Sequence, residues 1–184
     1  MAVVQILKYP DYFLTIAREE FGDLCLVTQI DDDALNLIQD LKDTLNHHNG
    51  YGLAARQIGS PKDVIAVNRM WDSTIQDPLI MINPVITRQD GSKKAIIESC
   101  FSVPGIEAKV ERPEIITVQY TDKDGKDHSR LVSGMEARII QHEIDHLNGI
   151  LFIQRLVEKE YKKVQNKINK MSFNKLGKFF NSCP

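Results

Sequence analysis

Two histidines and a glutamate are the residues of this sequence whose types and spacing point most directly to chemistry. The segment His142-Glu143-Ile144-Asp145-His146 carries two imidazoles four residues apart. On a helix, residues at this spacing lie on one face, so both rings can bind one metal ion. Glu143 lies beside the first ring, within reach of water at such an ion. The segment therefore predicts a hydrolytic metal site.

The alternative interpretation of this segment is a surface helix that carries two histidines by chance. Ile139 and Met135 precede the histidines on the same face, and further apolar residues occupy the opposite face. This pattern predicts a helix that is buried on both sides. Buried imidazoles and a buried carboxylate need partners, and a metal ion satisfies all three.

A hydrolytic metal ion usually has three protein ligands and one open position, so a third ligand is needed. A metzincin peptidase would have a histidine six residues after His146, where this chain has Phe152. A thermolysin-like peptidase would need a downstream glutamate. The only candidates, Glu158 and Glu160, lie in a charged segment directly after an expected strand, where they are poorly positioned to reach the metal.

Cys100 is the remaining candidate, because it ends an apolar stretch in Glu98-Ser99-Cys100-Phe101-Ser102. A structural buried cysteine is the alternative. We assign that structural role to Cys25. Cys183 lies at the end of the chain, where we expect a frayed terminus.

The segment GYGLAARQIG at 50–59 resembles a dinucleotide-binding fingerprint in its Gly50, Gly52 and Ala55. That fingerprint requires a hydrophobic strand before it, whereas a polar-faced helix precedes it here. A pair of glycines does allow the backbone to approach an extended substrate, and Gln57 supplies a neutral hydrogen-bond donor.

Both helices and short strands are predicted around these residues. Helical spacing predicts a helix over 31–46, and a second helix from a Ser133/Glu136 capping box to the stop at Asn148-Gly149. Apolar stretches predict strands at 64–68, 79–86 and 95–101, and a hairpin spans 116–132 around Asp124-Gly125. The tail after Arg155 is expected to be helical in its first half.

The composition predicts one globular domain, since the chain has 184 residues of which 42% are hydrophobic. The net charge of −2 argues against a nucleic-acid-binding protein, but the charge is unevenly distributed. Residues 154–184 hold eight Lys and Arg against two Glu, or +6, and residues 1–153 hold the remaining 15 basic and 23 acidic side chains, or −8. The odd number of cysteines favours a reducing compartment, and with no signal-like or membrane-spanning segment we expect a cytoplasmic protein.

Taken together, GYGLAARQ, ESCFS and QHEIDH resemble the signature motifs GxGLAAxQ, EGCLS and HExxH of peptide deformylases. The resemblance extends from ILKYPD at 6–11, through INP at 82–84, to LFIQRL at 151–156. It implies an α+β fold with antiparallel sheets around a central helix bearing HExxH. The catalytic domain would span 1–156, and 157–184 would form a basic C-terminal tail.

The resemblance also implies an activity: hydrolysis of the N-formyl group from the initiator methionine of new polypeptides. The metal ligands would be Cys100, His142 and His146. Glu143 would move the protons, while the Gln57 amide and the Phe101 N–H would hold the oxyanion. Substrate would bind against a further group of residues, namely Gly50, Tyr51, Gly52, Met135 and Ile139.

One thiolate and two imidazoles suit Fe(II), Zn(II), Co(II) or Ni(II), and the resemblance favours Fe(II). It also suggests that Glu98 pairs with Arg112 to brace the strand that carries Cys100. We expect a monomer that binds no DNA. The basic tail predicts a polyanionic partner, for which ribosomal RNA is the candidate, while a solvated helix is the alternative.

Three positions depart from the family motifs. Ser99 replaces the usual glycine of EGCLS, Phe101 replaces the leucine, and Glu107 stands where some members have arginine. Two other functions therefore stay open: a zinc peptidase with a glutamate ligand, and a deformylase-like binding protein that has lost activity through Ser99.

Overall fold

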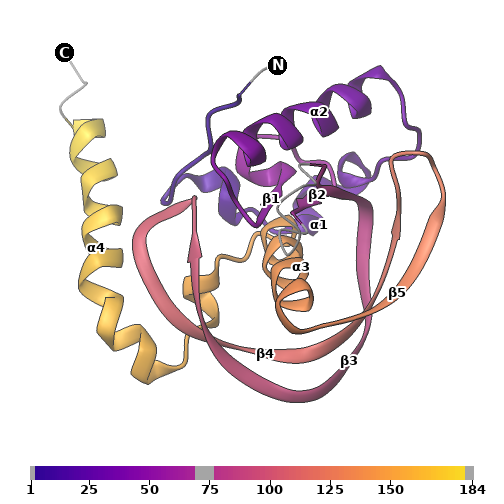
Figure 1. Ribbon diagram of the computed structural model, residues 1–184. Helices are drawn as coiled ribbons and strands as arrows, with labels where there is room; N and C mark the ends of the chain where they lie inside the picture. The colour runs from indigo at the N-terminus through magenta and orange to yellow at the C-terminus, as the bar shows by residue number, and fades with distance from the viewer. Residues whose placement is uncertain (1–2, 69–76, 181–184) are drawn as a thin grey trace.

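The computed structural model describes residues 3–68 and 77–180, with side chains described up to residue 172. One antiparallel sheet has the strand order β1-β2-β3-β4-β5. Its strands are β1 (Gly52–Ala54), β2 (Val64–Val67), β3 (Leu79–Cys100), β4 (Val103–Thr121) and β5 (Asp127–Ser133). The long β3 and β4 curve around the helix α3 (Gly134–Leu147), which lies at the centre of the molecule (Figure 1). The expected α+β class with a central helix is confirmed.

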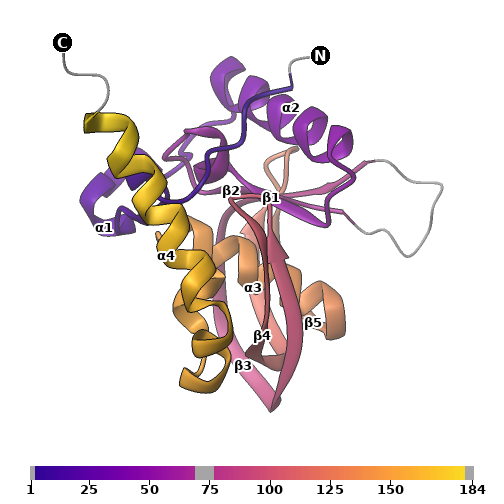
Figure 2. The same ribbon diagram turned by 90° about the vertical axis from the view of Figure 1, so that its left-hand side faces the viewer.

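Three other helices surround this centre. Helix α2 (Asp32–His47) contacts β1 and β2, the short α1 (Arg18–Phe21) follows the N-terminal segment, and α4 (Glu158–Phe180) lies along β4 (Figures 1 and 2). Four 3-10 turns complete the fold: η1 (Tyr12–Thr15), η2 (Gly22–Cys25), η3 (Ala55–Ile58) and η4 (Phe152–Arg155). The segment at 152–155 is therefore a 3-10 turn and not the strand that the sequence suggested.

The two strands expected at 79–86 and 95–101 are a single strand, β3. The polar residues between them continue the pairing with β4, although the register shifts between Asp90 and Lys93. Gly91, with φ of 76°, lies at this irregularity. Because both faces of this stretch are solvent-exposed, its sequence shows no hydrophobic alternation, and the sequence therefore predicted two separate strands where there is one.

Helix α3 begins at the predicted residue, but the predicted capping box does not form. Ser133 is the N-cap, and its side chain makes no capping hydrogen bond. Glu136 instead pairs with Arg130 of β5, with 2.9 Å between Oε1 and Nη1. The predicted stop is confirmed, because Gly149 has a φ of 73° and its N–H donates to the carbonyl of His146.

Other predicted elements are also confirmed. Helix α2 is capped by Asp31, whose Oδ1 accepts the N–H of Ala34 at 2.9 Å. The hairpin between β4 and β5 turns at Gly125, which has a φ of 78°.

Apolar side chains form three buried clusters. The first lies between α3 and the sheet, the second lies between α2 and strands β1 and β2, and the third joins β4, η4 and α4. Val164 and Ile168 bring α4 into the third cluster, so the tail is packed onto the domain, and its helix extends further than the predicted first half. Among the described residues, no helix is long and apolar enough to cross a membrane.

Candidate metal centre

The ligand atoms of Cys100, His142 and His146 all lie within 4.8 Å of one another. Cys100 is the last residue of β3, and both histidines project from one face of α3. The Cys100 Sγ lies 3.2 Å from His146 Nε2. The structure thus brings together the three residues for which the sequence predicted metal binding, from elements more than forty positions apart in the chain.

Glu98 orients His142 from the side away from the cysteine. Its Oε2 lies 2.9 Å from His142 Nδ1, which leaves Nε2 of that ring directed toward the centre. Arg112 donates two hydrogen bonds to this carboxylate, at 2.7 and 3.0 Å, and Arg138 donates a third at 2.6 Å. Burial opposes ionisation, but His142 and Arg112 outweigh it and lower the pKa of Glu98 to about 2. The predicted Glu98–Arg112 pair is confirmed.

The surroundings of the Cys100 thiol favour its ionised form. Burial alone would raise its pKa, but the imidazoles of His146 and His142 hold the pKa of Cys100 well below its ordinary value. The Ser102 N–H also donates to the sulfur, at 3.4 Å. A thiolate beside two imidazoles is a donor set that fits a divalent transition metal.

Glu143 is buried beside the histidines. Its Oε2 has no hydrogen-bond partner among the described residues, and burial raises the pKa of Glu143 to about 7. Gly52 of β1 lies against it, since a Cβ at position 52 would be 2.8 Å from the Glu143 Cγ and Cδ and would collide with Oε1. Position 52 therefore has no space for a side chain, and any larger residue there would displace the Glu143 carboxylate.

Gln57 approaches the same centre from the turn η3. Its Oε1 accepts the N–H of Ala54 at 2.9 Å, which fixes the amide. Its Nε2 donates to Ser102 Oγ at 3.1 Å and lies 3.5 Å from Cys100 Sγ. An N–H donor is thus held beside the candidate metal ligands, and the backbone of Phe101 lies next to Cys100 in the chain.

A cavity of about 420 Å³ opens onto this centre. All five predicted substrate-binding residues line it: Gly50, Tyr51, Gly52, Met135 and Ile139. Their backbone groups are partly engaged already, because the Gly50 N–H donates to the Leu45 carbonyl and the Gly50 carbonyl accepts from Asn68 Nδ2. Met135 is 42% exposed and Ile139 is buried, so together they offer apolar surface at the wall of the cavity.

The three departures from the family motifs are accommodated. Ser99 pairs with Glu107 in the β3–β4 ladder and has no positive φ, so this position does not require a glycine. The ring of Phe101 lies 5.4 Å from the ring of His48 and packs against the backbone of Gly50. Glu107 is exposed.

The competing ligand candidates are not part of the cluster. Glu158 and Glu160 lie on α4, where they pair with Lys162 and Lys163. Cys25 is fully buried and packs in the interior, as expected, whereas Cys183 lies outside the described residues.

Sequence reasoning missed Arg138 and Asp145, both of which are buried beside the centre. Asp145 accepts hydrogen bonds from Arg112 at 2.7 Å and from Arg155 at 2.6 Å. Arg138 lies four residues before His142 on one face of α3, and this spacing was the available signal. Its contact with Glu98 depends on how β3 lies against the helix, which the sequence does not reveal.

Comparisons with known proteins agree with this geometry. A family model described as polypeptide deformylase matches residues 3–162. A peptide deformylase of Desulforudis audaxviator is 44% identical over 156 residues, covering 84% of this chain and 94% of the relative. That of Maricaulis maris is 36% identical, covering 95% and 97%. The structure of a Plasmodium falciparum peptide deformylase in complex with an inhibitor has a TM-score of 0.80 at 38% identity, covering 91% of this chain and 98% of that one. The structure of a peptide deformylase from Legionella pneumophila has a TM-score of 0.78 at 32% identity, covering the whole of both chains.

Proposed function

Because the chain belongs to the polypeptide deformylase family, we propose that Cys100, His142 and His146 hold its metal ion and that Glu143 moves the protons of the reaction. Members of this family are metal-dependent enzymes that remove the N-formyl group from nascent peptides, and the present chain is such a hydrolase. The observation that carries the site assignment is the convergence of three ligand atoms within 4.8 Å beside a buried carboxylate.

The donor set fits a divalent ion in three respects. The sulfur lies in surroundings that favour a thiolate, His142 is oriented by Glu98, and the neighbouring Glu143 Oε2 has no protein partner among the described residues. We propose Fe(II) as the ion in the cell, with Zn(II), Ni(II) or Co(II) able to replace it. When bound, the ion supplies Lewis acidity toward the formyl carbonyl and toward water.

Glu143 is proposed as the proton carrier. A buried carboxylate next to the ligands can accept a proton from the attacking water and later deliver it to the departing amine. The contact with Gly52 supports this role, because it holds the carboxylate against the cavity.

Two donors are proposed to hold the oxyanion that forms at the formyl carbon. The Gln57 amide is held by its bonds to Ala54 and Ser102, and its Nε2 lies 3.5 Å from Cys100 Sγ, beside the proposed position of the oxyanion. The Phe101 N–H is the second donor. Such a donor typically contributes about 3 to 4 kcal/mol of transition-state stabilisation.

Substrate selection is proposed to reside in the cavity of about 420 Å³. Met135 and Ile139 would contact the methionine side chain, and burial of that side chain contributes roughly 1.5 to 3 kcal/mol. The segment from Gly50 through Tyr51 to Gly52 would lie along the substrate main chain.

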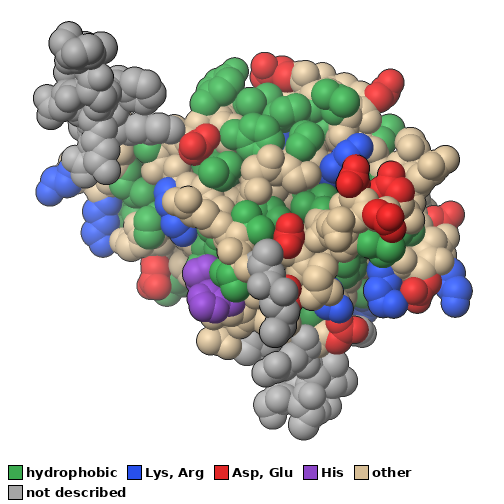
Figure 3. Space-filling view, turned by 90° about the horizontal axis from the view of Figure 1, so that it is seen from above, with side chains coloured by type: hydrophobic (Ala, Val, Ile, Leu, Met, Phe, Trp, Pro, Cys, Tyr) green, Lys and Arg blue, Asp and Glu red, His purple; other side chains and the backbone are tan. Residues whose placement is uncertain are grey.

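Partners beyond the formylated peptide are also proposed. The exposed lysines of α4 would contact ribosomal RNA, which would bring the enzyme to its substrate as the nascent chain emerges. Lys and Arg side chains are visible at the left-hand edge of Figure 3, on the side where α4 lies. We further propose a monomeric, cytoplasmic enzyme.

The direct test is release of formate from formyl-Met-Ala-Ser by the iron-loaded protein. Formate with intact Met-Ala-Ser is the expected result. Cleavage of the Met-Ala bond would instead indicate a zinc peptidase, and tight binding without turnover would indicate a binding protein.

A further inference from the structure

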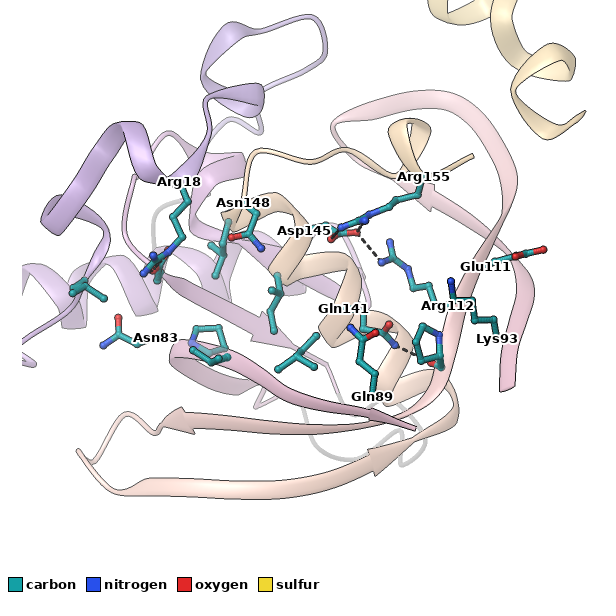
Figure 4. A pocket seen from close by; sticks show the side chains of 18 residues that line it. Arg18, Asn83, Gln89, Lys93, Glu111, Arg112, Gln141, Asp145, Asn148 and Arg155 are labelled. Atoms are coloured by element: carbon teal, nitrogen blue, oxygen red, sulfur yellow. Dashed lines mark hydrogen bonds and ion pairs between the residues drawn. The ribbon is translucent and has the colours of Figure 1, made fainter. Parts of the chain in front are cut away.

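A second cavity, of about 510 Å³, is lined by a different set of α3 residues from the active-site cavity, and Figure 4 shows its lining. We call it the rear cavity. Gln141, Ile144 and Asp145 of α3 line it, whereas His142 and Glu143 line the active-site cavity. At 3.6 residues per turn these two sets project from opposite faces of the helix. The proposed deformylase mechanism does not use the rear cavity.

One end of the rear cavity is built from charged side chains. The Asp145 carboxylate accepts hydrogen bonds from Arg112 at 2.7 Å and from Arg155 at 2.6 and 3.2 Å (Figure 4). Arg112 is 4% exposed, while the side chain of Arg155 is 46% exposed. Arg155 is therefore able to contact a ligand without the structure having to open.

Positive charge is in excess at this end. The connected network holds three guanidiniums and two carboxylates, namely Arg112, Arg138, Arg155, Glu98 and Asp145. These five side chains carry one net positive charge, and Arg155, whose side chain is 46% exposed, is the member of the network that a ligand in the cavity can reach.

Lys93 adds to this excess. It lines the same cavity and makes no ion pair among the described residues. Glu111 also lines the cavity, but Figure 4 shows it pointing away from Asp145. An anionic group placed between Arg155 and Lys93 would balance the surplus charge.

The remaining lining suits a peptide. Gln141 uses both N–H groups of its amide on the carbonyls of Pro113 and Ala137, so its Oε1 faces a ligand only as an acceptor. Gln89 lies next to it in Figure 4 and is exposed. Side chains of Val85, Ile86 and Ile144 supply apolar surface between these amides.

The far end of the cavity offers a further acceptor. Arg18 donates a hydrogen bond from Nε to Asp63 Oδ2 at 2.7 Å, and its Nη2 forms an ion pair with the same oxygen. Asp63 is only 3% exposed, and its Oδ1 has no hydrogen-bond partner among the described residues. To satisfy it, an N–H group of a ligand would have to displace the side chains that cover this atom.

We propose that the rear cavity binds the carboxyl-terminal end of a peptide. The terminal carboxylate would lie between Arg155 and Lys93, and the peptide groups would lie against Gln89 and Gln141. This site is distinct from the one that takes the formylated amino end of a substrate, and it does not depend on the deformylase assignment.

The test uses the full-length, metal-loaded protein and acetyl-Ala-Ala-Ala, which has a free carboxylate but neither formyl group nor methionine. Binding is measured by calorimetry and by shifts of backbone amide NMR signals. The acid should bind and should shift signals of residues 83–89 and 141–148, while the carboxyl-terminal amide of the same peptide should bind at least tenfold more weakly. Equal affinity for the acid and the amide would overturn the proposal.

Variants locate the site. Lys93→Gln should weaken binding of the acid about tenfold, whereas Lys94→Gln removes the same charge one residue away, outside the cavity lining, and should leave the affinity unchanged. Val85→Trp should block the cavity and abolish binding. If Val85→Trp binds the peptide normally, or if the peptide competes with formyl-Met-Ala-Ser for turnover, binding occurs elsewhere and the proposal is wrong.

Two further ligands distinguish the source of the anion. Acetate and inorganic phosphate should each bind more weakly than the peptide, because they lack the amide and apolar contacts. If either binds as tightly as the peptide and with the same dependence on Lys93, the cavity is a simple anion site and the peptide assignment is overturned.

Discussion

Cys100 and Cys25 are both embedded in the protein, yet their electrostatic surroundings differ. Burial raises the pKa of the Cys25 thiol, while two imidazoles hold the pKa of Cys100 well below its usual range. Only Cys100 is therefore prepared to act as a thiolate ligand.

This difference predicts opposite outcomes for two matched substitutions. Cys100→Ala should lower bound metal to less than about a tenth of an equivalent, since two histidines alone make an incomplete site. Cys25→Ala should keep its metal while losing some stability through a small cavity. Elemental analysis of both purified variants decides the matter: a full equivalent of metal in Cys100→Ala would disprove the ligand assignment.

Arg112 supports the site through Glu98 and Asp145. Arg112→Met should lower the free energy of unfolding by about 3 to 5 kcal/mol, because it breaks hydrogen-bonded ion pairs to two buried carboxylates at once. Metal affinity should fall roughly 10 to 100-fold as His142 loses its orientation. Denaturant unfolding and a metal-competition titration measure the two effects.

The control is Arg88→Met, which removes an exposed pair with Asp90 worth under about 1 kcal/mol. Equal stability loss in the two variants would mean that the buried network contributes no more than a surface pair.

Residue types and spacing pointed to His142, His146 and Glu143, and left Cys100 as a candidate ligand. The resemblance to deformylase motifs supplied the choice of Cys100 and the Glu98–Arg112 pair. Arg138 and Asp145 were missed because a buried charge is identified by its partners, and those partners lie on β3, on β4 and beyond α3. Which residues from other elements become such partners is not readable from one sequence alone.

At the scale of elements, the site depends on how α3 ends and where β3 stops. Both helices longer than ten residues that the sequence predicted are present, because caps and apolar periodicity are local signals. The length of β3 was not predictable, since its exposed middle lacks alternation and its pairing with β4 is a tertiary property.

Gly149 fixes the end of α3 against the N-terminal segment. A Cβ at this position would lie 2.8 Å from the carbonyl carbon of Ile16 and would collide with its oxygen, and φ is 73°. Gly149→Ala should therefore lower the unfolding free energy by about 2 to 4 kcal/mol, combining backbone strain with the steric clash. Thermal or denaturant unfolding provides the measurement.

Gly125→Ala is the matched control, with a similar φ of 78° but no atom nearer than 3.9 Å. It should lose only the strain component, about 1 kcal/mol. If both variants lose the same amount, contact with Ile16 does not hold the helix end.

At the scale of the whole molecule, α4 combines a buried apolar face with an exposed basic one. Val164 and Ile168 pack in the third cluster, so deleting the helix would expose that core. The charge asymmetry was readable from composition. The apolar residues Tyr161, Val164, Ile168 and Met171 of the tail recur at helical spacing, but this pattern does not reveal that they pack onto β4.

Neutralising the exposed lysines tests the proposed ribosome contact while preserving this packing. Changing Lys159, Lys162, Lys167 and Lys170 to Gln should leave turnover of formyl-Met-Ala-Ser nearly unchanged and reduce co-sedimentation with ribosomes at low salt. The dependence of binding on salt should also become shallower, by roughly one unit of slope for each lost phosphate contact. Co-sedimentation equal to that of the wild type would leave the helix with a purely structural role.

We propose a metal centre of Cys100, His142 and His146 with Glu143 as its proton carrier. The decisive variant is Glu143→Ala, with formate release and metal content measured on one preparation and Glu136→Ala as a control on the same helix. We expect a full equivalent of metal in both variants. Because a positioned acid-base group contributes about 100-fold or more, turnover by Glu143→Ala should fall below about a hundredth of the wild-type rate. Metal-replete Glu143→Ala that keeps more than about a tenth of the wild-type kcat would contradict this proposal.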